Sequence, residues 1–158
     1  MKRIAIFDKV SESEYLKHGT KEEYDFISFP QRATSGSAGY DFFAPKDILL
    51  KPLETVKVAT GIRVKIEDGW LLQIFPRSSL GFKYRLTLDN TVGIIDSDYY
   101  YADNEGHIFI KMTNLGNKEL FIEKGKAFAQ GIFTEYGITM DDVCSTARTG
   151  GIGSTDKK

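Results

Sequence analysis

Short segments in which apolar and polar residues alternate are the feature that most constrains the fold of this chain. Alternation with a period of two is typical of strands that have one buried and one solvated face. Pro, Gly, Asn and Asp residues separate these segments and indicate turns. The pattern therefore predicts an all-β sandwich or barrel. The segments expected to form strands are residues 3–10, 24–29, 55–64, 70–75, 107–113, 120–122 and 127–136.

The sequence predicts one short helix, because Ser78 or Ser79 can cap a turn that continues to Tyr84. Residues 11–18 form either a second short helical turn or an exposed loop. The glycine-rich residues 144–158 have almost no apolar periodicity, and we expect them to be ordered only by a ligand or a neighbouring subunit. We therefore expect one β-rich domain over residues 1–143, with residues 144–158 as an arm of the same domain.

Composition excludes several classes of protein. A chain of 158 residues suits a single domain. Its 21 Lys and Arg residues against 22 Asp and Glu residues argue against a surface that binds long nucleic acid. Cys144 is the single cysteine, and with two histidines it cannot form a usual structural zinc site. We find no signal peptide and no run of apolar residues long enough for a membrane span, so we expect a soluble, cytoplasmic protein.

Asp96 is the first candidate for chemistry. It follows the apolar run Val92–Ile95, which resembles a buried strand, and a charge beside such a strand is costly unless it has a function. Alternatively, Asp96 and Asp98 simply open a turn, which aspartate favours through hydrogen bonds to its own backbone. The stretch alone supports either interpretation.

A candidate phosphate site lies at Arg77, Ser78 and Ser79. A guanidinium group directly before a helix start combines a planar set of donors with free backbone N–H groups. An ordinary helix cap beside a solvated arginine is the alternative. A serine nucleophile is disfavoured, because it needs a general base, and both histidines, His18 and His107, lie in polar stretches of sequence.

Five motifs occur in a fixed order between Ala33 and Thr155, and together they resemble the trimeric dUTPase family. They are residues 37–44, 76–83, 89–100, 125–130 and 148–155. The resemblance implies a jelly-roll-like homotrimer that hydrolyses dUTP to dUMP and pyrophosphate. This activity keeps uracil out of DNA and supplies dUMP for thymidylate synthesis. The resemblance also implies that three subunits share each active site, with the arm donated to a neighbour.

The resemblance assigns roles to single residues. Asp96 would hold the water that attacks the α-phosphorus and would also bind the 3′-hydroxyl group. Asp41 would hold Mg²⁺ through water molecules, as that ion prefers, although a structural role in a turn is also open for Asp41. The ring of Tyr99 would pack on deoxyribose and exclude a 2′-hydroxyl group; a packing role is its alternative. Arg77 and Ser78 would bind the phosphates, and Ser79 stands where many members have glycine.

Further residues complete the implied site. Asn90 and the backbone of residues 93–95 would read the uracil edge, with Gly93 allowing close backbone approach. Gln130 would lie near the phosphates, unless it only forms the polar face of a strand. Two features depart from the family pattern, namely Ile152 in place of an aromatic residue and a longer segment at residues 100–106. The full set implied to bind substrate is Arg77, Ser78, Ser79, Asn90, Gly93, Ile95, Tyr99, Gln130, Arg148, Gly151, Gly153 and Ser154.

Three alternatives remain. A dCTP deaminase shares the fold and binds a related nucleotide, but it attacks C4 of cytosine. A jelly-roll binding or capsid-like protein would have no turnover. A phage-type enzyme would in addition dock onto a regulatory protein.

Overall fold

The computed structural model describes residues 1–148, 150 and 151, and it is built mainly from short strands. Every strand pairing described is antiparallel. The all-β class predicted from the alternation is therefore confirmed. The strands are β1 (Ala5–Lys9), β2 (Gln31–Arg32), β3 (Tyr40–Phe43), β4 (Ile48–Leu50), β5 (Thr55–Ala59), β6 (Ile62–Ile66), β7 (Trp70–Pro76), β8 (Leu86–Leu88), β9 (Gly93–Ile95), β10 (Phe109–Asn114), β11 (Leu120–Ile122) and β12 (Ala127–Glu135).

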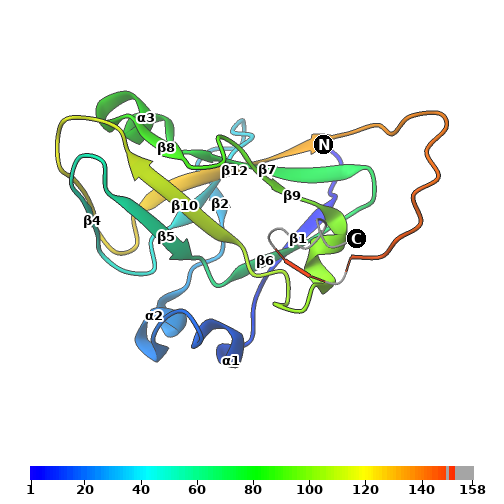
Figure 1. The fold of residues 1–158 in the computed structure, drawn as a ribbon, viewed down its shortest axis with the longest axis horizontal. Coiled ribbons are helices and arrows are strands. Elements are labelled where there is room, and N and C mark those ends of the chain that lie inside the picture. The colour runs from blue at the N-terminus through cyan, green and yellow to red at the C-terminus, as the bar shows by residue number, and fades with distance from the viewer. Residues whose placement is uncertain (149, 152–158) are drawn as a thin grey trace.

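The strands form one larger sheet and three smaller ones that share a core (Figure 1). The larger sheet has the order β2-β3-β12-β7-β9, and a second sheet has the order β5-β10-β8. The pairs β1-β6 and β4-β11 complete the fold. The crossovers between strands distant in sequence bring motifs from different parts of the chain onto one sheet.

The core follows from the alternation along the central strands. In β7, Leu72 and Ile74 are buried, whereas Gln73 and Phe75 between and after them are partly exposed. Phe128 of β12 and Met112 of β10 are fully buried in the same apolar cluster. Because successive side chains of a strand point to opposite faces, the residues on the other face of β7 are free to form a site.

The described part of the chain also contains four short helices: α1 (Glu12–Tyr15), α2 (Lys21–Phe26), α3 (Ser78–Tyr84) and the 3-10 helix η1 (Ser97–Tyr101). The strand predicted at residues 24–29 is wrong, because Thr20 and Glu23 form a capping box that starts α2. The prediction that Ser78 or Ser79 caps α3 is also wrong, since Arg77 occupies the cap position without a side-chain hydrogen bond. No helix in residues 1–148, 150 and 151 has the length and apolar character needed to cross a membrane.

The strand predicted at residues 55–64 is two strands. Gly61 has φ +69 and ends the extended run, so that β5 pairs with β10 and β6 pairs with β1. The segment predicted at residues 11–18 begins as a helical turn, with Ser11 as the cap of α1. The strands β2, β3, β4 and β8 have two to four residues each, too few for a periodic pattern to be visible.

After β12 the chain continues as an exposed segment, residues 136–147, that forms no helix or strand. Figure 1 shows this segment running away from the sheets and returning beside η1. Its return brings Arg148 next to the end of β9. The arm predicted from residue 144 therefore meets the third motif within the same chain.

Candidate functional site

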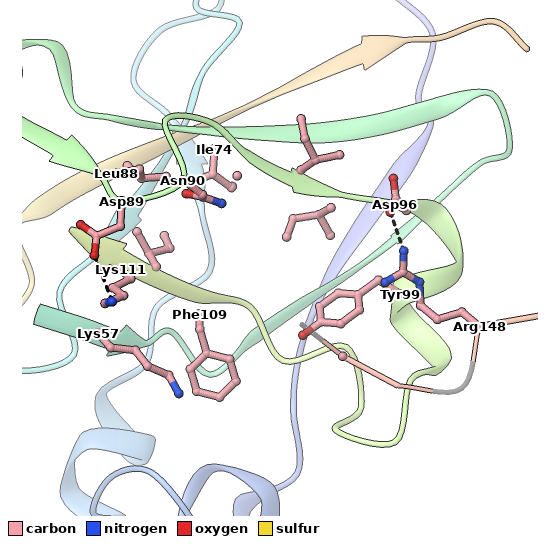
Figure 2. A pocket seen from close by; sticks show the side chains of 15 residues that line it. Lys57, Ile74, Leu88, Asp89, Asn90, Asp96, Tyr99, Phe109, Lys111 and Arg148 are labelled. Carbon is pink, nitrogen blue, oxygen red and sulfur yellow. Dashed lines mark hydrogen bonds and ion pairs between the residues drawn. The ribbon is translucent and has the colours of Figure 1, made fainter. Parts of the chain in front are cut away.

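A cavity of about 520 Å³ collects most of the residues of the third motif. Figure 2 shows Asp89, Asn90 and Lys111 at one end of it and Asp96, Tyr99 and Arg148 at the other. Of the residues implied by the resemblance, the structure thus brings seven together. They are Asn90, Gly93, Ile95, Asp96, Tyr99, Arg148 and Gly151.

Asp96 lies between β9 and η1, at the point where the extended chain turns into the 3-10 helix. Its side chain is 47% exposed and makes no capping hydrogen bond to η1. The guanidinium group of Arg148 lies 2.6 Å from one Asp96 oxygen, and its Nε atom donates to Asp98 at 2.9 Å. One Asp96 oxygen thus has a partner in Arg148, and the carboxylate remains open to solvent.

Tyr99 forms the buried wall of the cavity and is only 7% exposed. Its hydroxyl group donates to the backbone carbonyl of His107 at 2.8 Å and accepts from Asn104 Nδ2 at 2.8 Å. Burial raises the pKa of the Tyr99 hydroxyl above its usual value. The group therefore remains a neutral donor at physiological pH, and two hydrogen bonds hold the hydroxyl end of the ring.

The hairpin that leads into β9 closes the other end of the cavity. Val92 N–H donates to the carbonyl of Asn90 at 2.7 Å, and Asn90 itself is exposed. Gly93 is buried, and a Cβ atom built on it would lie 3.1 Å from Cβ of Ile74. The close approach that the glycine allows is therefore made by β7, and it seats the hairpin on the sheet.

The second and fourth motifs form a separate cavity of about 590 Å³. Arg77, Ser78 and Gln130 line it, together with Phe82 and Ile132. Ser79 is exposed beside it and is not among the lining residues. The structure thus places Arg77, Ser78 and Gln130 together but leaves Ser79 at the rim.

Asp41 belongs to this second group. It pairs with Gln130 across β3 and β12, and Arg77 Nη2 lies 3.4 Å from its carboxylate. A Cβ atom built on Gly39 would lie 2.6 Å from Gln130 Oε1, so a side chain at position 39 would displace the end of the Gln130 side chain. The Asp41 side chain is 16% exposed. A carboxylate, an amide and a guanidinium group therefore face one small region.

The two cavities share no lining residue. Ile74 lines the first and its neighbour Phe75 lines the second, and neighbouring residues of a strand point to opposite faces of the sheet. A single chain therefore holds Asp96 and Arg77 in different cavities.

Some predicted residues fall elsewhere, and some lining residues had no signal in the sequence. Gly153 and Ser154 lie outside the described residues, as does Ile152. Lys57 and Lys111 line the first cavity because they face each other across β5 and β10. That register is a long-range property, and no local motif marks either lysine.

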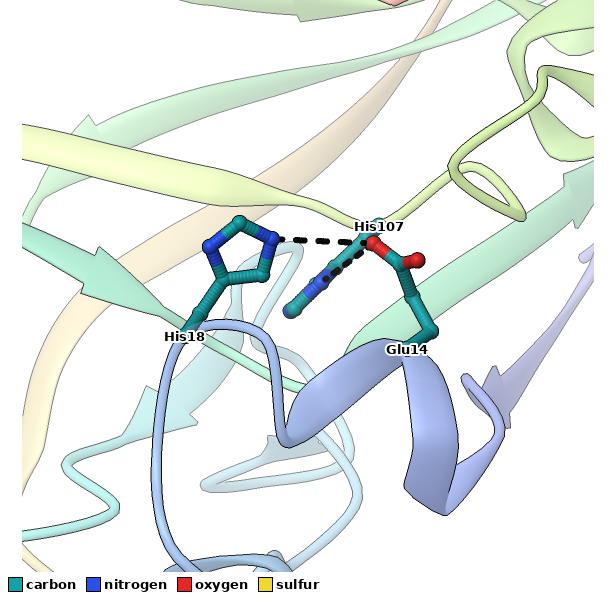
Figure 3. Close-up of side chains that lie close together, drawn as sticks. All are labelled: Glu14, His18 and His107. Atoms are coloured by element: carbon teal, nitrogen blue, oxygen red, sulfur yellow. Dashed lines mark ion pairs between the residues drawn. The ribbon is translucent and has the colours of Figure 1, made fainter.

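Glu14, His18 and His107 form a cluster (Figure 3), and both imidazole rings lie next to Phe109, which lines the first cavity. His18 Nε2 and His107 Nδ1 each lie 3.7 Å from Glu14 Oε1. Two imidazoles and a carboxylate are a common zinc ligand set. However, the N–H group of Gly61 donates to His107 Nε2 at 2.9 Å, so the neutral ring carries its proton on Nδ1. His107 therefore faces Glu14 as a donor and cannot also bind a cation through Nδ1.

His107 is fully buried, although the stretch of sequence before it is polar. Burial lowers its pKa to about 4, and His18 adds to this effect, whereas Glu14 and Glu105 oppose it. The unfolded chain takes up a proton on this residue near pH 6.5, and the folded chain does so only near pH 4.

We therefore expect the free energy of unfolding to decrease as the pH falls from 6.5 to 4, by up to about 3 kcal/mol from this group. Unfolding by denaturant at several pH values, at a fixed protein concentration, measures this change in the free energy of unfolding. In His107→Gln, whose side-chain oxygen can accept from Gly61, this part of the pH dependence should be absent. His18→Gln is the matched control and should retain most of it, because burial is the largest cause of the lowered pKa. An identical pH slope in wild type and His107→Gln would contradict the assignment.

Comparison with known proteins agrees with these motifs. The sequence model of the dUTPase family matches residues 25–155. The deoxyuridine 5′-triphosphate nucleotidohydrolase of Lactococcus lactis is 40% identical over 139 residues, which cover 86% of this chain and 93% of that protein. The enzyme of the same name from Hydrogenobaculum sp. is 37% identical over 149 residues, covering 90% and 100%.

The fold agrees as well. The crystal structure of the dUTPase from Streptococcus mutans superposes with a TM-score of 0.67 at 33% identity, covering 84% of this chain and 97% of that one. The family match includes all five motifs, since it spans residues 25–155. This chain belongs to the dUTPase family.

Proposed function

We propose that this chain hydrolyses dUTP to dUMP and pyrophosphate by attack of water on the α-phosphorus. The observation that carries the proposal is the first cavity, where Asp96 and Tyr99 lie at one end and the Asn90 hairpin at the other. A cavity of about 520 Å³ has the size of a nucleotide site. The proposal places the base at the hairpin, the sugar on Tyr99 and the α-phosphate beside Asp96.

Asp96 is the proposed general base. Its carboxylate has one oxygen on Arg148 and is about half exposed, so it can accept a hydrogen bond from a water molecule. Phosphoryl transfer depends mainly on positioning and on charge stabilisation, so one carboxylate with well-placed cations suffices. Arg148 holds the carboxylate in place and adds positive charge where the phosphates would lie.

Arg77, Ser78 and Gln130 are the proposed ligands of the phosphate chain. The guanidinium group offers a planar pair of donors, and the first N–H groups of α3 are unpaired within the helix. In the single chain the partner of Arg77 is Asp41. A triphosphate would compete for that guanidinium group.

Asp41 fits the role of a Mg²⁺ ligand. Asp41 pairs with Gln130 across β3 and β12, and a carboxylate is an oxygen donor that suits Mg²⁺ that keeps some of its water molecules. When bound, the ion would neutralise charge on the phosphate oxygens. Arg77, at 3.4 Å from Asp41, would hold the carboxylate toward the same oxygens.

We propose that the active enzyme is a homotrimer, present in the cytoplasm, whose sites are shared between subunits. The support is the separation of the two cavities, since neither contains both the proposed base and the proposed phosphate ligands. A neighbouring copy related by cyclic symmetry can bring the second cavity of one chain to the first cavity of another. The arm, which here lies on its own Asp96, could make the same contact with a neighbour.

The test is the release of pyrophosphate from dUTP, UTP, dTTP and dCTP, each with and without Mg²⁺. We expect rapid release from dUTP with Mg²⁺ and little from the other nucleotides. Ammonia released from dCTP would instead indicate a deaminase. If no nucleotide reacted, the proposed activity would be refuted, and a binding protein of the same fold would be the alternative.

A further inference from the structure

The 100–106 segment, which lengthens the third motif, is folded against Tyr99. Backbone hydrogen bonds link Ala102 to Tyr99 and Glu105 to Ala102. Gly106 has φ +70, and a Cβ atom built on it would lie 2.7 Å from the carbonyl oxygen of Tyr99. The segment is therefore a tight loop that only glycine at position 106 permits.

The loop is also tied to the N-terminal part of the chain. Glu105 accepts hydrogen bonds from the N–H group of Ser11 at 2.7 Å and from its hydroxyl group at 2.6 Å. Tyr100 donates from its hydroxyl group to Asp8 at 2.7 Å. The two anchors hold the loop to β1 and to the start of α1.

This arrangement presents the side chain of Asn104 to Tyr99. Asn104 Oδ1 accepts from the N–H group of Gly106 at 3.2 Å, which orients the amide so that Nδ2 points to the Tyr99 hydroxyl at 2.8 Å. The backbone carbonyl of His107 accepts a hydrogen bond from the Tyr99 hydroxyl group. The Tyr99 hydroxyl group thus donates one hydrogen bond and accepts another. The ring cannot tilt without breaking one of these hydrogen bonds.

We propose that Asn104 is a positioning residue that sets the depth of the Tyr99 ring and, through it, the exclusion of ribonucleotides. The inference rests on the proposed function, in which Tyr99 packs on the sugar. A 2′-hydroxyl group is rejected by the lack of space, so a ring free to move by a fraction of an ångström would admit it more readily. The loop that carries Asn104 lies outside the sugar-binding cavity and acts on it through one hydrogen bond.

The arm meets the same amide. A Cβ atom built on Gly151 would lie 3.3 Å from Asn104 Nδ2, so the arm passes directly over Asn104 in this chain. A side chain at position 151 would press on the group that holds Tyr99. Asn104 therefore connects the wall of the cavity to the segment that covers it.

The experiment compares kcat/KM for dUTP and UTP in Asn104→Leu, which retains the size of the side chain but removes the donor. We expect the dUTP preference to fall about fivefold to tenfold, the factor associated with one hydrogen bond. In a Tyr99→Phe background, which lacks the hydroxyl group, the same substitution should change the preference by less than about twofold. Asn117→Leu, at an exposed turn, is the matched control and should leave the preference unchanged.

The outcomes are distinguishable. A wild-type enzyme without dUTP preference would refute the proposed function itself. A wild type with preference, but an Asn104→Leu variant that retains it, would overturn the inference alone. Asn104→Asp, which has no N–H donor, serves if the leucine variant does not fold, and it should also lower the preference. If both variants lose their folded structure while Asn117→Leu does not, Asn104 has a purely structural role and the inference fails.

Discussion

Asp96→Asn is expected to lower kcat for dUTP hydrolysis by about 10²–10⁴-fold, the range for loss of a positioned general base. Asparagine keeps the size of the side chain and can still accept from Arg148, so the cavity should retain its shape. The amide cannot take a proton from water at neutral pH. Binding of α,β-imido-dUTP, measured by calorimetry, should therefore weaken by less than about tenfold, because asparagine retains an acceptor for Arg148 and a hydrogen bond contributes about 1 kcal/mol.

Asp103→Asn is the matched control, since Asp103 is an exposed aspartate close to Asp96 in sequence. It removes the same charge and should leave both kcat and binding near the wild-type values. If Asp96→Asn retained more than about a tenth of the wild-type kcat, another group would have to activate the water, and the assignment of the general base would be wrong.

The sequence predicted the fold best where strands are long. β7 and β12 have seven and nine residues, and their alternation was visible without any tertiary information. The helix α2 was mistaken for a strand because Tyr24, Phe26 and Ile27 favour strands, whereas the capping box at Thr20 decides the local structure. Here a specific pair of cap hydrogen bonds outweighed the strand propensity of these residues.

The sequence predicted only part of the site, because a motif reports local structure and not long-range contacts. Asp96 and Tyr99 lie within one short motif, so their proximity follows from local structure, and Arg148 was assigned through the order of the motifs. The contact between Asn104 and Tyr99 depends on positive φ at Glu105 and Gly106, which closes the loop. The burial of His107 and the facing lysines of β5 and β10 depend on strand register, which no local pattern specifies.

The motifs alone do not show the separation of the two cavities; it was the family resemblance that implied a site shared between three subunits. The order of motifs implies one site, but it does not show which residues one chain can bring together. Adjacent residues Ile74 and Phe75 line different cavities because the strand alternates its faces. This geometry makes Arg77 the most informative position after Asp96.

Arg77→Ala is expected to lower kcat/KM for dUTP by about 10²-fold, through loss of a charge-assisted pair of hydrogen bonds to phosphate. Both KM and kcat should change, because the guanidinium group would hold the phosphates before and during attack. Arg77→Lys retains the charge but loses the planar fork, so it should recover only part of the activity. Arg3→Ala, at an exposed position, removes the same charge and should have no effect. Steady-state kinetics with dUTP and Mg²⁺ measure all three variants.

Mixing the two impaired variants tests where Arg77 acts. If each site takes Asp96 from one subunit and Arg77 from another, trimers refolded from equal amounts of Asp96→Asn and Arg77→Ala contain both intact residues in roughly a quarter of their sites. Hydrolysis should then recover to about a quarter of the wild-type rate, far above either variant alone. If one chain supplied both residues to a site, mixing would restore nothing, because every chain would still lack one of them. A mixture no more active than its components would therefore place Asp96 and Arg77 of the same chain in one site and refute the shared arrangement.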